Sequence, residues 1–133
     1  WYSLWRGGPG GGVRMVWWPR DQIGYLKPFS PHSPQAISCP ILVRSGPAKV
    51  FVNASGLGAQ SHLRVSLLDE GFRPLPDYSG DAAAVLDQNG FRVPVRWAGA
   101  EALPEGRSLR LDVQFGGTRP EDGRLHAAYV AAA

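Results

Sequence analysis

Two stretches near the middle of the chain alternate apolar and polar residues, which is the pattern of a half-buried β-strand. The alternating apolar positions are Leu63, Val65 and Leu67 in residues 62–68 and Val93, Val95 and Trp97 in residues 91–97. The connection between them, residues 72–80, is too rich in proline to form a helix. Two such strands joined in this way predict an antiparallel β domain.

The same alternation is clearest in residues 108–115. Here Leu109, Leu111, Val113 and Phe115 are predicted to face the core and Arg110, Asp112 and Gln114 to face solvent. Further strands are predicted at residues 1–5, 13–18, 23–26, 36–43, 49–54 and 124–130, with Pro40 at an edge or bulge of the strand at 36–43. Residues 82–86 are the one stretch that could form a helical turn.

Turn residues separate these strands at intervals of roughly 8 to 12 residues, the spacing of an all-β sandwich. The 17 glycines and 12 prolines also favour turns over long helices. We therefore predict an all-β fold, an antiparallel β-sandwich of jelly-roll-like form. A β-barrel is the alternative.

The length of 133 residues suits one domain with a buried core. We assign residues 30–130 to the sandwich and residues 131–133 to a tail or a vector remnant. Residues 1–29 are assigned to further strands. These strands either belong to this domain, or they belong to or contact an upstream domain. The chain lacks an initiator Met and starts on an aromatic segment, so we expect it to be a piece of a longer protein.

Charge and cysteine content narrow the class of partner. The net charge is +3, and the 14 basic residues are scattered, which argues against a nucleic-acid partner. No apolar run reaches the roughly 18 to 20 residues of a membrane span, so no membrane partner is expected.

Cys39 is the only cysteine and lies in an apolar run, so we predict a buried thiol and no disulfide framework. The compartment stays open, and secretion is compatible with this composition.

Residues with catalytic or metal-binding chemistry do not form a motif. The histidines are His32, His62 and His126, with no spacing typical of a metal site. Asp69 and Glu70 lie on a turn and are interpreted as turn residues, as is Asp21 beside Arg20. We therefore predict no catalytic residue, no metal and no cofactor for this segment.

The remaining functional signal is aromatic. Five tryptophans are many for this length, and flat aromatic faces stack on the apolar C–H faces of sugar rings. The candidate sugar-binding residues are Trp5, Trp17, Trp18, Tyr25 and Tyr78. The alternative is that these aromatics form the sandwich core or the seam to another domain. Trp97, which ends an alternating strand, is predicted to lie in the core.

Four short segments occur along the chain in an order that resembles a known family. They are residues 17–29, 50–54, 63–79 and 93–97, and they include the runs Trp-Pro-Arg-Asp, Val-Asn-Ala, Leu-Arg-Val and Val-Arg-Trp. This order resembles the C-terminal part of bacterial proteins with a glycoside hydrolase family 32-like five-bladed propeller, over about residues 13 to 130. The chain departs from that pattern at Gln22 and Asp77, where the family has glycine.

The resemblance implies a β-sandwich packed beside a catalytic propeller that carries the catalytic carboxylates, so no catalytic residue is carried over. It implies a non-catalytic accessory domain whose partner is the upstream catalytic domain of the same parent chain. The alternative is an independent carbohydrate-binding module that binds a glycan through exposed aromatics. A third reading, an enzyme in its own right, would need a pocket with paired carboxylates.

Overall fold

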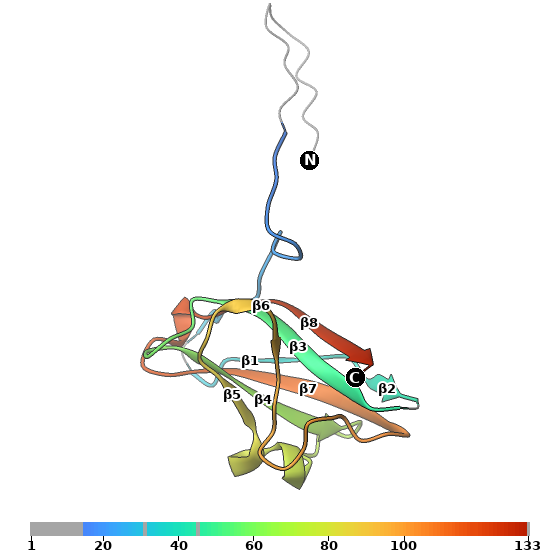
Figure 1. Ribbon diagram of the computed structural model, residues 1–133. Coiled ribbons are helices and arrows are strands. Elements are labelled where there is room, and N and C mark those ends of the chain that lie inside the picture. Colours follow the sequence, from blue (N-terminus) through green and yellow to red (C-terminus); the bar gives the residue numbers. More distant parts are fainter. Residues whose placement is uncertain (1–14, 31, 45, 133) are drawn as a thin grey trace, which may run out of the picture.

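The protein is an antiparallel β-sandwich (Figure 1). A computed structural model describes residues 15–30, 32–44 and 46–132. In this part of the chain the strands form two packed sheets and not a closed barrel, so the predicted all-β sandwich is confirmed. The predicted strand at residues 1–5 lies outside the described residues. No helix in the described ranges is both long enough and apolar enough to span a bilayer.

Within the described residues, one sheet has five strands and the other has three, and every pairing between strands is antiparallel. The five-stranded sheet follows the order β1 (Gln35–Ile37), β7 (Arg107–Gly116), β4 (His62–Asp69) and β5 (Ala84–Leu86), with β2 (Ile41–Val43) also paired to β7. The three-stranded sheet follows the order β6 (Gly90–Pro94), β3 (Ala48–Ser55) and β8 (Arg124–Ala132). Three short 3₁₀ turns are η1 (Pro76–Tyr78), η2 (Gly80–Ala82) and η3 (Pro120–Asp122).

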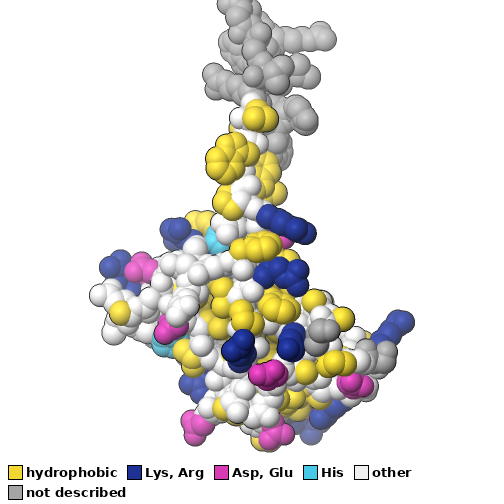
Figure 2. Space-filling model, in the orientation of Figure 1, with side chains coloured by type: hydrophobic (Ala, Val, Ile, Leu, Met, Phe, Trp, Pro, Cys, Tyr) yellow, Lys and Arg dark blue, Asp and Glu magenta, His cyan; other side chains and the backbone are white. Residues whose placement is uncertain are grey.

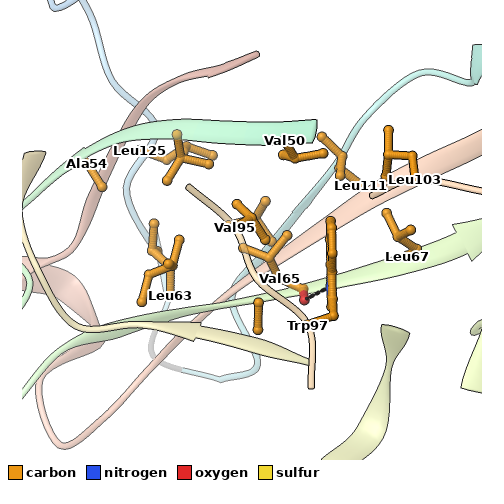
Figure 3. Packing of buried hydrophobic residues seen from close by; sticks show 14 of the residues in the cluster. Val50, Ala54, Leu63, Val65, Leu67, Val95, Trp97, Leu103, Leu111 and Leu125 are labelled. Carbon is orange, nitrogen blue, oxygen red and sulfur yellow. Dashed lines mark hydrogen bonds between the residues drawn. The ribbon is translucent and has the colours of Figure 1, made fainter. Parts of the chain in front are cut away.

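The core forms where the predicted alternating positions of the two sheets meet. Leu63, Val65 and Leu67 of β4 are fully buried, and Trp97, which follows β6, is also in the core as predicted. The Trp97 Nε1–H donates to the Val65 carbonyl oxygen at 2.9 Å (Figure 3). This bond satisfies the buried indole and ties the chain after β6 to the opposite sheet.

Strand β7 confirms four predicted core positions and corrects one predicted surface position. Leu109, Leu111, Val113 and Phe115 are buried. Asp112, predicted to face solvent, is buried as well, because it is flanked by Ile37 of β1 and Ser66 of β4 in the middle of the sheet. Its Oδ2 accepts a hydrogen bond from Gln114 at 2.8 Å, and its Oδ1 has no partner among the described residues.

The single strand predicted at residues 36–43 is wrong, because the chain breaks into β1 and β2 around Cys39 and Pro40. Proline has no N–H to donate to the ladder, so pairing with β7 stops there and resumes at Ile41. The same break leaves Cys39 exposed, which corrects the predicted buried thiol.

Residues 82–86 also differ from the predicted helical turn. The turn η2 ends at Ala82, and Ala84–Leu86 is strand β5, paired with β4. Ala84 and Leu86 are buried while Val85 is exposed, so alternation and tertiary pairing decide this segment. At the end of the chain, β8 continues through Ala131 and Ala132, which pair with Lys49 and Ala48.

Candidate functional site

Among the described residues, the most exposed large apolar side chains lie on residues 15–29, which we call the apolar segment. This segment rises from the sandwich, and hydrophobic side chains follow it (Figures 1 and 2). Trp17 is 80% exposed and Ile23 is 76% exposed. The other exposed members are Met15, Val16, Trp18, Tyr25, Leu26 and Phe29.

The apolar segment contains little of the predicted strand structure. Residues 15–18 form no strand, and of residues 23–26 only Leu26 pairs, in an isolated bridge with Leu125. Two backbone hydrogen bonds of 2.8 and 2.9 Å make that bridge. Pro19 explains the interruption, because it starts a turn that the Gln22 N–H closes on the Pro19 carbonyl at 3.1 Å.

Side chains of β8 fix the end of the apolar segment to the sandwich. The Tyr25 ring meets the His126 ring edge-on at a centroid distance of 5.7 Å, and the Arg124 guanidinium lies 5.1 Å from the Tyr25 centroid. His126 Nδ1 lies 3.1 Å from the Gly24 carbonyl oxygen and Nε2 lies 2.8 Å from Ser55 Oγ. A carbonyl only accepts, so Nδ1 carries the proton toward Gly24.

A cavity of about 400 Å³ opens beside this anchor. It lies between β1 and β8, at the flank where the two sheets have their edge strands. Its lining includes Tyr25 and Leu26 of the apolar segment and the core residues Leu111, Val113 and Leu125. The apolar segment and this cavity therefore form one continuous apolar flank.

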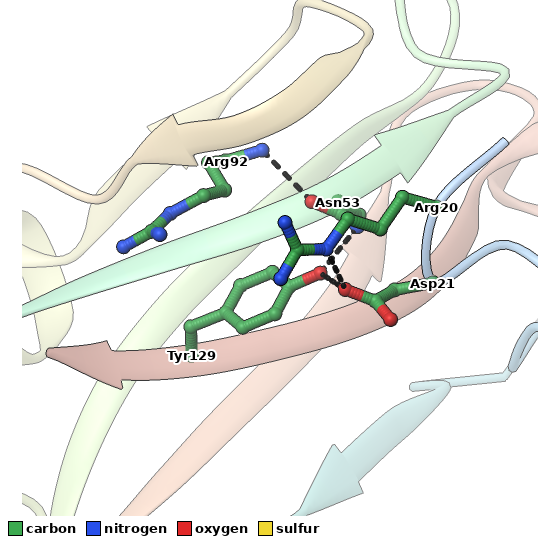
Figure 4. Close-up of polar contacts among 5 residues, drawn as sticks. All are labelled: Arg20, Asp21, Asn53, Arg92 and Tyr129. Carbon is green, nitrogen blue, oxygen red and sulfur yellow. Dashed lines mark hydrogen bonds and ion pairs between the residues drawn. The ribbon is translucent and has the colours of Figure 1, made fainter.

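A chain of hydrogen bonds crosses the outer side of the three-stranded sheet (Figure 4). Asn53 is fully buried; its Oδ1 accepts the Arg92 backbone N–H at 2.8 Å, and its Nδ2 donates to the Tyr129 hydroxyl at 2.6 Å. That hydroxyl donates to Asp21 Oδ2 at 2.6 Å. The Arg20 Nε lies 3.6 Å from the same oxygen.

The pKa of Tyr129 is raised by desolvation and further by the hydrogen bond to Asp21 and its negative charge. Tyr129 therefore stays a neutral phenol and keeps donating to Asp21. The network fixes the Tyr129 hydroxyl and the Arg92 backbone relative to Asn53.

Four residues of the same sheet form what we call the aromatic shelf: Phe51, Phe91, Arg92 and Tyr129. The Arg92 Cζ lies 4.9 Å from the Phe51 centroid and 5.5 Å from the Tyr129 centroid, within the range of cation–π attraction. The Phe91 and Tyr129 rings meet edge-on at 6.4 Å. All three strands of the sheet contribute to the shelf.

The structure places the predicted sugar-binding residues in two regions. Trp17, Trp18 and Tyr25 lie together on the apolar segment and are exposed. Tyr78 lies away from them, edge-on against Trp97 at 5.3 Å, and donates to the Ala102 carbonyl at 3.1 Å, so it supports the core. Trp5 lies outside the described residues.

Sequence reasoning missed the aromatic shelf. The alternation in residues 49–54 carried a usable signal, since it places Phe51 on the face opposite Val50 and Val52. Nothing in the sequence marked Arg92, whose backbone adopts a left-handed φ of 53°.

Comparison with known proteins gave no match: no family model, no curated protein and no solved structure matches the chain. Among the residues that the structure describes, no group of three or more His, Cys, Asp or Glu side chains is placed to hold a metal ion.

Proposed function

We propose that this chain is a non-catalytic accessory β-sandwich of a carbohydrate-active, glycoside hydrolase-like protein, and that it packs against the catalytic propeller of the same parent chain. The observation that carries the proposal is the exposure of the apolar segment, residues 15–29. Contiguous exposed apolar surface of this kind marks interaction sites in soluble domains.

The composition of the apolar segment suits the centre of an interface. Aromatic side chains are enriched there and dominate the binding energy when they are fully desolvated. Burying a side chain such as Trp17 or Ile23 contributes roughly 2–3 kcal/mol of transfer free energy. Several such residues on one segment offset the entropy lost when two domains associate.

The cavity between β1 and β8 supports docking on the same flank. It is lined mainly by apolar side chains and connects with Tyr25 and Leu26 of the apolar segment. A partner side chain that enters it extends the sandwich core, because Leu111, Val113 and Leu125 already line it.

Calorimetric titration of the chain with the separately produced catalytic propeller of its parent protein tests the proposal. We expect saturable binding that falls at least about tenfold when Trp17 and Ile23 are both replaced by serine. The control is Val85→Ser, which replaces a 57% exposed apolar residue on β5 and should leave binding unchanged. No binding by the unaltered chain, or equal binding by the double variant, would contradict the proposal.

A second candidate function is an independent carbohydrate-binding module. It is favoured by the exposure of Trp17, Trp18 and Tyr25 on one segment, since exposed aromatic faces stack on sugars. It predicts that the isolated chain binds neutral glycans and that Trp17→Ala abolishes this binding. Titration of the chain against a panel of neutral glycans separates the two candidates.

A further inference from the structure

The guanidinium group of Arg92 has no anionic partner in the described part of the chain. It is exposed, and no carboxylate of these residues lies within 4.0 Å of its nitrogens. Asp21 is already committed to Tyr129 and Arg20 through Oδ2. An unpaired cation on a folded surface is complementary to an anionic ligand.

The aromatic shelf holds this cation in place. The Arg92 Cζ lies 4.9 and 5.5 Å from the centroids of Phe51 and Tyr129, so cation–π attraction favours this position of the guanidinium before any ligand binds. A guanidinium held beside aromatic rings still presents N–H groups, in a planar fork that fits the two oxygens of a carboxylate. Contacts that favour one position of the guanidinium reduce the side-chain entropy lost on binding.

Apolar and polar groups around the aromatic shelf narrow the class of ligand. Phe91 is 48% exposed and offers an aromatic surface next to the cation. Asp21 Oδ1 forms no hydrogen bond to the described residues and accepts a hydroxyl, while the exposed Arg20 donates to one. These groups together fit a sugar-like ring that has an apolar C–H face and one carboxylate. Its hydroxyls can donate to Asp21 and accept from Arg20.

We propose that the aromatic shelf, with Arg20 and Asp21 at its rim, binds a uronic acid residue of an acidic saccharide. The carboxylate pairs with Arg92, the apolar ring face packs on Phe91, and hydroxyls reach Asp21 and Arg20. The choice of a saccharide rests on the proposed carbohydrate-active function, whereas the binding of a carboxylate depends on the shelf alone. The site lies on the three-stranded sheet and uses none of the exposed aromatics of the apolar segment; from that segment only Arg20 and Asp21 contribute.

Calorimetric titration of the chain with trigalacturonic acid, the matching neutral galactose trisaccharide and triglutamate tests this site. We expect trigalacturonic acid to bind at least about tenfold more tightly than either of the other two probes. Binding should weaken about tenfold or more in Arg92→Gly, which removes the guanidinium but suits the left-handed backbone there. Arg92→Lys keeps the charge without the planar fork and should bind with intermediate affinity.

Two further variants make the test specific. Phe91→Ala should weaken binding several-fold, and Arg107→Ala, an equal loss of charge on the five-stranded sheet, should not change it. The proposal is overturned if trigalacturonic acid does not bind, if either other probe binds as tightly, if Arg92→Gly binds normally, or if Arg107→Ala weakens binding equally. Docking of Trp17 and Ile23 on a propeller is measured separately, so it can succeed while this site fails.

Discussion

At the scale of single residues, Asn53 shows how one buried side chain replaces part of a β-ladder. The pairing of β3 with β6 shifts register between Val52 and Ala54, and Asn53 lies at that shift. Its amide bonds both the Arg92 N–H and the Tyr129 hydroxyl. The strand irregularity and the aromatic shelf therefore depend on the same amide.

Replacing Asn53 by alanine should lower the free energy of unfolding by about 1–3 kcal/mol, because the Arg92 N–H loses its acceptor and the Tyr129 hydroxyl loses one of its two partners. Chemical denaturation followed by tryptophan fluorescence measures the change. Gln88→Ala, at an exposed loop position, is the control and should stay within about 0.5 kcal/mol of the parent protein. Equal stabilities of the two variants would show that Asn53 does not stabilise the register shift between β3 and β6.

Asp112 gives a second residue-scale prediction. Burial raises the pKa of this carboxyl, and the hydrogen bond from Gln114 lowers it in part. The folded protein therefore binds this proton more tightly than the unfolded chain, whose pKa is near 3.8. The free energy of unfolding should fall as the pH rises from about that value through the raised folded pKa.

Asp112→Asn should make this fall shallower, and Gln114→Ala should extend it to higher pH. Urea denaturation at closely spaced pH values between about 3.5 and 7 measures both effects. If the asparagine variant reproduces the pH profile of the parent protein, Asp112 does not carry this linkage.

At the scale of elements, alternation predicted the long strands better than the short ones. Strands β4 and β7 follow their predicted ranges closely, because one face of each is continuously apolar. The break between β1 and β2 follows from Pro40, which was visible in the sequence, but its effect on the exposure of Cys39 was not. Strand β5 is only three residues long and depends on its pairing with β4, which no local pattern reveals.

Only part of the candidate site was predicted, because a local sequence pattern does not reveal which elements lie side by side. The aromatic residues Trp17, Trp18 and Tyr25 were identified by type, but only the structure places them on one exposed segment. The aromatic shelf combines three strands that are distant in sequence, and Arg92 reaches it through an irregular backbone. Sequence periodicity describes one strand at a time and does not give the neighbours across a sheet.

A matched pair of leucine variants tests the assignment of faces to the strands. Leu67→Ala on β4 should cost about 2–5 kcal/mol of unfolding free energy, because it leaves a cavity between the sheets. Leu42→Ala on β2 removes the same atoms from a side chain that is 58% exposed and should cost less than about 1 kcal/mol. Thermal and chemical denaturation of both variants gives the comparison, and similar losses would contradict this packing.

At the scale of the whole molecule, apolar surface is divided between a closed core and an open flank. The core is filled by side chains from both sheets, while the apolar segment and the cavity between β1 and β8 stay accessible. A flank of this kind is consistent with the proposed accessory role beside a propeller. The aromatic shelf lies on the outer side of the three-stranded sheet and gives the proposed saccharide site its own surface.

The most direct test of this account is hydroxyl-radical footprinting of the chain alone and of the chain together with the catalytic propeller of its parent protein. We expect Trp17, Trp18 and Ile23 to be oxidised rapidly in the chain alone and to be protected when the propeller is present. Val85 and Phe72, exposed apolar residues elsewhere on the sandwich, should be oxidised equally in both samples. Unchanged oxidation of Trp17 and Ile23 in the presence of the propeller would contradict the central claim that the apolar segment is a docking surface.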